Sequence, residues 1–110
     1  MVALDPDYSD FLLTATKAWQ ERGPRTDQDY LLKVMEEAGE VAEAFSRYGG
    51  TNPHKGPATG HMVPVVQELA DVVCTALVAI IHFGFNPNDL LEQQMAKVKT
   101  RYPEIWTVGS

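Results

Sequence analysis

The sequence predicts an all-α protein, a bundle of four or five helices in a single domain over residues 1–110. Apolar residues recur at three- and four-residue spacing in several long segments, as on one face of a helix. No segment alternates apolar and polar residues as a half-buried strand does. Because the chain has only 110 residues, a second core is not expected.

The ends of the helices are marked by residues with known positional preferences. Thr26 and Asn86 are of the types that cap helix N-termini, and Pro64 and Pro87 are favoured in a first turn. Gly84 is expected to end the third helix. The predicted helices cover residues 7–22, 27–48, 64–83 and 87–102.

Residues 49–63, GGTNPHKGPATGHMV, separate the second helix from the third. This segment has four glycines, two prolines and no helical period. A connection of this length is uncommon in a small domain, where it often serves as a lid or a connector. We therefore expect a mobile loop over residues 49–63.

The charge balance limits the partners. Nine basic and fifteen acidic residues give a net charge of −6 and a pI near 4.9. Affinity for a nucleic-acid polymer comes mainly from neutralising phosphates, so no such partner is expected. An acidic protein that handles phosphates usually needs a bound cation to supply the positive charge.

The sequence also favours a cytoplasmic location. The single cysteine, Cys74, excludes an internal disulfide framework and suits a reducing compartment. The first residues, MVALDPDYSD, lack the basic and apolar parts of a signal peptide. The most apolar run, Leu77–Ile81, is too short to span a bilayer, so no membrane partner is expected.

The second predicted helix carries a row of acidic residues. At about 100° per residue, Glu36, Glu37 and Glu40 share one face within roughly a third of a turn. Taken alone, such a row is most simply a solvated acidic face. The predicted apolar stripe next to it comprises Leu31, Val34, Ala38, Val41 and Phe45.

The third predicted helix makes that simple explanation less satisfactory. It is apolar almost all round, which predicts a central buried helix, yet it carries Glu68 and Asp71 one turn apart. Glu68 can favour the helix dipole, but an ionised Asp71 in a buried helix needs a partner or a metal. Acidic groups on two facing helices predict a site for a hard divalent cation, Mg²⁺ or Mn²⁺.

These residues resemble a known signature. The segment VMEEAGEV, with Glu68-Leu69-Ala70-Asp71 after it, resembles the EE-x-x-E and E-x-x-D motifs of MazG-like nucleotide pyrophosphohydrolases. Lys97-x-x-x-Arg101 and the following PEIW are similar to the end of the family's pattern. The resemblance covers about residues 30–106, most of the chain.

The resemblance implies Mg²⁺-dependent cleavage of an NTP or dNTP between its α- and β-phosphates, in nucleotide-pool sanitation, by a homodimer or homotetramer. Glu36 and Glu37 would be catalytic, with Glu36 adding a ligand or positioning the attacking water. Lys97 and Arg101 would hold phosphates, and Lys33, one turn before Glu37, pairs with it or reaches phosphate. The implied metal ligands are Glu37, Glu40, Glu68 and Asp71.

Two alternatives stay open to different degrees. A non-catalytic helical metal-binding module, for interaction or regulation, would keep the bundle and the metal without turnover. A di-iron or di-manganese bundle is disfavoured because such sites use Glu-x-x-His, whereas Glu68 is followed by Asp71. Trp19, Tyr30 and Trp106 could stack on a base, although aromatic residues at helical spacing more often belong to the core.

Overall fold

The computed structural model describes residues 1–23, 25–49 and 62–106. Over these residues the chain is all-α, with four helices and no strand: α1 (Pro6–Glu21), α2 (Asp27–Gly49), α3 (Val63–His82) and α4 (Pro87–Arg101). Each helix begins and ends within one residue of the predicted bounds. Most of the predicted mobile loop, residues 50–61, lies outside the described residues.

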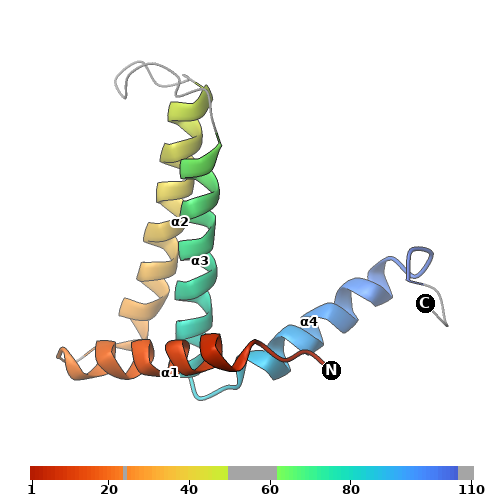
Figure 1. The fold of residues 1–110 in the computed structure, drawn as a ribbon, viewed down its shortest axis with the longest axis horizontal. Helices are drawn as coiled ribbons and strands as arrows, with labels where there is room; N and C mark the ends of the chain where they lie inside the picture. Colours follow the sequence, from red (N-terminus) through yellow and green to blue (C-terminus); the bar gives the residue numbers. More distant parts are fainter. Residues whose placement is uncertain (24, 50–61, 107–110) are drawn as a thin grey trace.

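The helices form an open arrangement. Figure 1 shows α2 and α3 running side by side in opposite directions, with α1 across one end of the pair. The fourth helix starts at that same end and then diverges from the pair. Three contacts tie its first turns to the N-terminus. The Leu4 amide donates to Asn88 Oδ1 at 2.8 Å, and the Val2 amide and the Met1 ammonium each lie 3.3 Å from Glu92 Oε1.

Local hydrogen bonds explain where the helices begin. Before α2, the Asp29 amide donates to Thr26 Oγ1 at 3.3 Å, and the Thr26 amide donates to Asp29 Oδ2 at 2.8 Å. This reciprocal pair is a capping box with aspartate as its acidic member. Before α4, Asn86 Oδ1 accepts from the Asn88 amide at 2.8 Å, which confirms the predicted N-cap.

Gly84 ends α3 in a left-handed conformation, with φ of 90°. Its amide donates to the carbonyl of Ile81 at 2.9 Å, and the Phe85 amide donates to that of Ile80 at 3.2 Å. These are the two hydrogen bonds of a Schellman motif. The abrupt stop sends the chain into α4 instead of prolonging α3.

The buried core lies where α1 crosses the α2–α3 pair. At this crossing Leu12 of α1 and Tyr30 of α2 pack against the C-terminal half of α3. The hydroxyl of the buried Thr16 donates to the Leu12 carbonyl at 2.8 Å, so this polar group is satisfied. The buried residues of this cluster are Leu12, Tyr30, Leu77, Val78 and Ala79.

His82, the last residue of α3, joins three helices at the same end. Its ring stacks on Tyr30 with centroids 3.8 Å apart, and its Nε2 lies 2.8 Å from Asp27 Oδ1. Its Nδ1 lies 3.5 Å from Gln20 Nε2 of α1. The histidine thus fixes the first turn of α2 against the end of α3, far from the acidic row, as its position eleven residues beyond Asp71 predicts.

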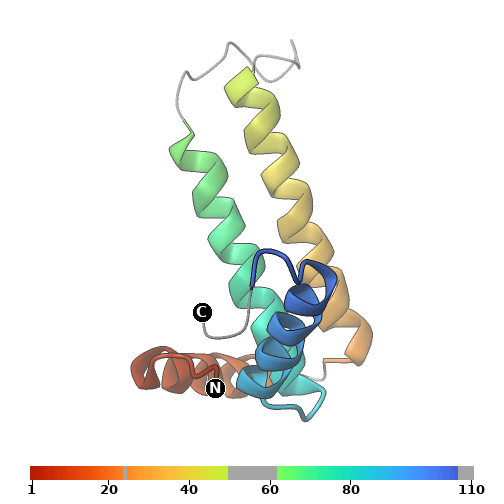
Figure 2. The ribbon, with the colours of Figure 1, turned by 90° about the vertical axis from the view of Figure 1, so that its right-hand side faces the viewer.

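The prediction that α3 is buried on all sides is wrong for the described chain. Val66, Leu69 and Val73 are 50%, 47% and 55% exposed, because α4 diverges from the α2–α3 pair (Figure 1). In Figure 2, α4 lies in front of only the end of the pair where α1 crosses. The predicted stripe of α2 is likewise only partly covered, since Leu31 and Phe45 are both about half exposed. The radius of gyration, 17.4 Å, exceeds the value of about 13 Å for a compact domain of this length.

By length and mean hydropathy alone, α3 could cross a membrane. Core helices of soluble proteins pass the same test. Glu68 and Asp71 interrupt the apolar run, and charged side chains are costly inside a bilayer. The prediction that the apolar segment is too short to span a bilayer is wrong by length, and 28% of the most apolar stretch of α3 is buried within the chain.

Candidate metal centre

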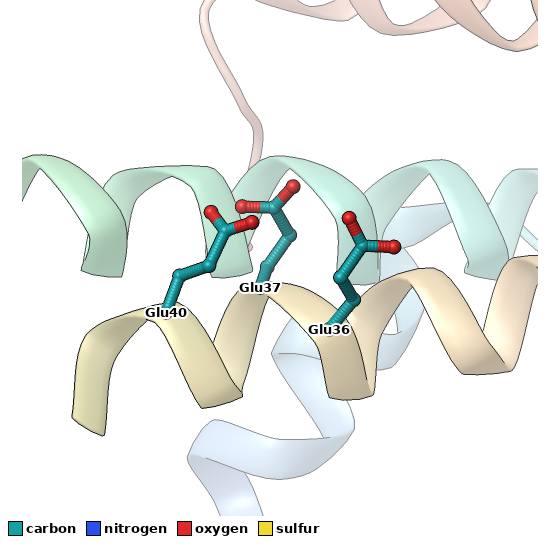
Figure 3. Close-up of side chains that lie close together, drawn as sticks. All are labelled: Glu36, Glu37 and Glu40. Carbon is teal, nitrogen blue, oxygen red and sulfur yellow. The ribbon is translucent and has the colours of Figure 1, made fainter. Parts of the chain in front are cut away.

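Three acidic side chains of α2 lie in a row toward α3. Figure 3 shows Glu36, Glu37 and Glu40 with their carboxylates side by side, Glu37 closest to the α3 ribbon. One carboxylate oxygen from each lies within 4.8 Å of the others. The helical period predicts this shared face, since positions three and four apart are neighbours on a helix surface.

The facing helix adds two more carboxylates. Glu68 and Asp71, one turn apart on α3, join Glu37 in a second group whose ligand atoms also lie within 4.8 Å of one another. Glu37 belongs to both groups and is therefore the centre of the cluster. The structure thus brings together all five acidic residues that the sequence singles out.

The burial within this cluster differs from the prediction. The sequence predicts Asp71 as the buried carboxylate, but it is exposed, although its ligand atom lies within 4.8 Å of those of Glu37 and Glu68. Glu37 is the buried one, at 8% exposure. It is therefore the carboxylate that most requires a compensating charge.

Lys33 supplies part of that charge. Its Nζ lies 3.2 Å from Glu37 Oε1 and 3.5 Å from Glu36 Oε1. The hydrogen bond to Glu37 raises the pKa of the lysine above its ordinary value. Of the two roles predicted for Lys33, the structure shows the ion pair with the acidic row.

One lysine leaves the other carboxylates poorly compensated. A hydrogen bond with Glu68, together with the charge of Glu37, raises the pKa of Glu40 from 4.5 to about 7. The second oxygen of Glu68, Oε2, is buried and has no hydrogen-bond partner among the described residues. Such an oxygen is costly unless something binds it.

The donor set fits a hard divalent cation. All five side chains offer oxygen and none offers nitrogen or sulfur, which suits Mg²⁺ or Mn²⁺ and not zinc or copper. A cation would satisfy Glu68 Oε2 and offset the repulsion that raises the pKa of Glu40. Which of the carboxylates are ligands stays a prediction.

The predicted phosphate-binding residues of α4 lie elsewhere. Lys97 and Arg101 are exposed on the part of α4 that diverges from the α2–α3 pair (Figure 1). Within the described part of one chain, neither forms an ion pair with the acidic cluster. Their predicted role in holding phosphates stays a prediction.

The sequence prediction did not include Arg47. Its Nη2 lies 3.3 Å from Glu43 Oε1, and it borders a recess of about 360 Å³ next to the cluster. The signal was present, because Arg47 is seven residues beyond Glu40 and so on the same helical face. This recess is lined by Glu40, Glu43, Ala44, Arg47, Pro64 and Glu68.

Fold and cluster together define an all-α protein with a candidate centre for a divalent cation between two antiparallel helices. Residues 25–106 match the family model of the MazG nucleotide pyrophosphohydrolase domain. The chain therefore belongs to the MazG family, as the sequence motifs predict. No curated protein and no solved structure gives a significant match.

The raised pKa of Glu40 predicts that stability depends on both pH and cation. Without metal, folded Glu40 keeps its proton up to about pH 7, whereas in the unfolded chain it ionises near its ordinary value. This group's contribution to stability therefore falls as pH rises through that range. A cation competes with the proton, so Mg²⁺ should raise the Tm more at about pH 8 than at about pH 5.5.

Thermal denaturation of wild type and Glu40→Gln, with and without Mg²⁺, checks this. Glu40→Gln should raise the Tm of the metal-free protein at about pH 8. It should also reduce the increase in Tm that Mg²⁺ causes. The matched control is Asp10→Asn, which neutralises an exposed carboxylate on α1 and should leave the gain unchanged. If Mg²⁺ raised the Tm of the wild type equally at both pH values, the proposed competition between the cation and the Glu40 proton would be contradicted.

Proposed function

We propose that the chain is a divalent-cation-dependent hydrolase that cleaves a nucleoside or deoxynucleoside triphosphate between its α- and β-phosphates. Hydrolysis of this anhydride consumes one water and yields a nucleoside monophosphate and pyrophosphate. One observation carries the proposal: four other carboxylates gather around the buried Glu37. Membership of the MazG family also supports the proposal.

The proposed cation is Mg²⁺, with Mn²⁺ as a possible substitute, held by Glu37, Glu40, Glu68 and Asp71. When bound, such a cation neutralises phosphate charge and lowers the pKa of a coordinated water. The protein itself has a net charge of −6. It therefore depends on bound cations to attract a polyanionic substrate.

The burial of the two central glutamates supports different roles for them. The Glu37 side chain is 10% exposed, whereas that of Glu36 is 60% exposed. A buried carboxylate is suited to hold a cation at a fixed position. We therefore assign Glu37 as the central catalytic ligand, and Glu36 as the residue that orients the attacking water or adds a ligand.

Lys33 would change partners when the cation binds. Its ammonium pairs with Glu36 and Glu37, and a cation on these carboxylates would weaken that attraction. The lysine then lies beside the cluster with donors for a phosphate oxygen. This makes Lys33 a substrate-binding residue as well as a partner of the acidic row.

The product supports a role in nucleotide-pool sanitation. A monophosphate lacks the anhydride that makes a triphosphate a polymerase substrate, so the reaction removes a nucleotide from use. We place this reaction in the cytoplasm, where a single unpaired cysteine, Cys74, is compatible with the redox conditions.

Analysis of phosphate products tests the proposed reaction. With Mg²⁺ and a panel of NTPs and dNTPs, we expect equal amounts of monophosphate and pyrophosphate, lost on adding a chelator. Asp71→Asn should lower kcat/KM by about a hundredfold or more, by analogy with the loss of other charge-stabilising groups, while Asp10→Asn should not. Mg²⁺ binding without turnover of any nucleotide would favour a non-catalytic regulatory module instead.

The uncovered apolar faces support a homodimer or homotetramer. The accessible surface of the chain is 7943 Å², against about 6,000 Å² for a compact protein of its mass. The difference is of the order that one partner buries in an obligate interface. Exposed apolar residues on α3 and beyond it include Val66, Leu69, Val73, Phe83, Phe85, Ile105 and Trp106.

In such an assembly, we propose that Lys97 and Arg101 of one copy reach the acidic cluster of another. Light scattering should then give two or four times the chain mass of 12.2 kDa. Glu40→Gln and Arg101→Ala should each be inactive alone. When the two variants are refolded together, about half of the dimers are mixed, and one of the two sites in each mixed dimer is intact. Up to about a quarter of the activity should therefore return. A fully active monomer, or no recovery, would contradict the shared site.

A further inference from the structure

A second recess lies at the opposite end of the acidic row from the Arg47 recess. It measures about 430 Å³ and opens between the end of α1 and the first turns of α2. Its walls combine an aromatic ring, two cations, two carboxylates and one aliphatic side chain. The lining residues are Trp19, Arg25, Asp29, Leu32, Lys33 and Glu36.

This recess is continuous with the candidate metal centre. Glu36 lines the recess and also belongs to the carboxylate cluster. Lys33 lines the recess while its ammonium lies within 3.5 Å of Glu36 and Glu37. A molecule whose phosphates bind at the cluster therefore has room for its adjoining group in this recess, and the recess beside Arg47 offers a second place among the described residues.

The Trp19 side of this recess pairs an aromatic ring with a guanidinium group. Arg25 Cζ lies 5.8 Å from the centroid of the Trp19 ring, and Arg25 Nε donates to the Trp19 carbonyl at 3.1 Å. Trp19 also packs against the buried Tyr30, with the two rings tilted by 38° and their centroids 6.3 Å apart. The guanidinium is thus held over an aromatic ring, although Arg25 itself is exposed.

Such a surface is suited to a nucleobase. Bases stack on aromatic rings and on arginine guanidinium planes with little dependence on sequence. The Arg47 recess has no aromatic residue in its described lining and is bordered by three glutamates and an arginine. Of the two recesses, the one at Trp19 combines an aromatic ring with an arginine, and it therefore fits a base better.

We propose that the recess formed by Trp19, Arg25 and Lys33 binds the nucleoside end of the substrate. The base stacks on the Arg25–Trp19 pair, and Lys33 lies between the base site and the phosphates. Trp19 and Arg25 are then the residues that hold the base by stacking. This inference rests on the proposed function, because it takes the phosphates to lie at the carboxylate cluster.

Two variants and one matched control test the role of the recess in turnover. Arg25→Gln removes the planar cation and leaves Trp19 in place, and Trp19→Phe keeps an aromatic ring in a residue that packs on the core. Each should raise KM by about tenfold for every base, the size expected for the loss of a stacking contact. Arg22→Gln, an exposed arginine that does not line the recess, should behave as wild type.

A binding measurement that needs no turnover completes the test. In a Trp106→Phe background, Trp19 is the only tryptophan, and titration with nucleoside monophosphates should quench its fluorescence. Inorganic phosphate should not quench this fluorescence. The gain in Tm on adding Mg²⁺ should be the same in Arg25→Gln as in wild type, since the carboxylates are intact.

The outcomes separate this inference from the proposed function. If Arg25→Gln and Trp19→Phe release pyrophosphate with unchanged KM values and base preference, the proposed role of the recess is contradicted. The proposed reaction would still be supported. Absence of quenching by any monophosphate in a protein that releases pyrophosphate would also contradict the role of the recess. Quenching by monophosphates without pyrophosphate release would support the recess while contradicting the reaction.

Discussion

The repulsion among five carboxylates at the α2–α3 contact is the constraint on which the rest of the structure depends. Glu37 is buried at the centre of the cluster, and Lys33 is the one cation that pairs with it in the described part of the chain. Hydrogen bonding with Glu68 and the charge of Glu37 raise the pKa of Glu40 to about 7, so a retained proton would relieve part of this repulsion when no cation is bound. A divalent cation would relieve it more completely, and the same cation would attract the phosphates of a nucleotide.

The remaining contacts hold the two acidic helices in a fixed relation. At the end where α1 crosses, His82 connects the end of α3 to Tyr30 and Asp27 at the beginning of α2. The recess at Trp19 opens at this same rigid end. Because the helical pair is long and α4 diverges from it, the apolar face of α3 stays uncovered, which is the physical basis for expecting a second copy of the chain.

Helical periodicity and capping residues were sufficient to predict the four helices and the gathering of the five acidic residues. The burial of Asp71 was predicted wrongly, because an apolar helix pattern shows that a face needs covering without showing whether the same chain covers it. The pairing of Arg25 with Trp19 could not be predicted, because it crosses the break between α1 and α2, where no regular spacing applies. The positions of Lys97 and Arg101 depend on how α4 leaves Gly84, which the sequence pattern does not define.

Calorimetric titration with Mg²⁺ at about pH 7, in buffers of different ionisation enthalpy, tests the central claim most directly. The account predicts saturable binding with release of protons, because the cation displaces the proton that Glu40 retains near that pH. It also predicts that Glu37→Gln abolishes this binding, since Glu37 is common to both carboxylate groups. Absence of Mg²⁺ binding in wild type, or undiminished binding in Glu37→Gln, would contradict the account.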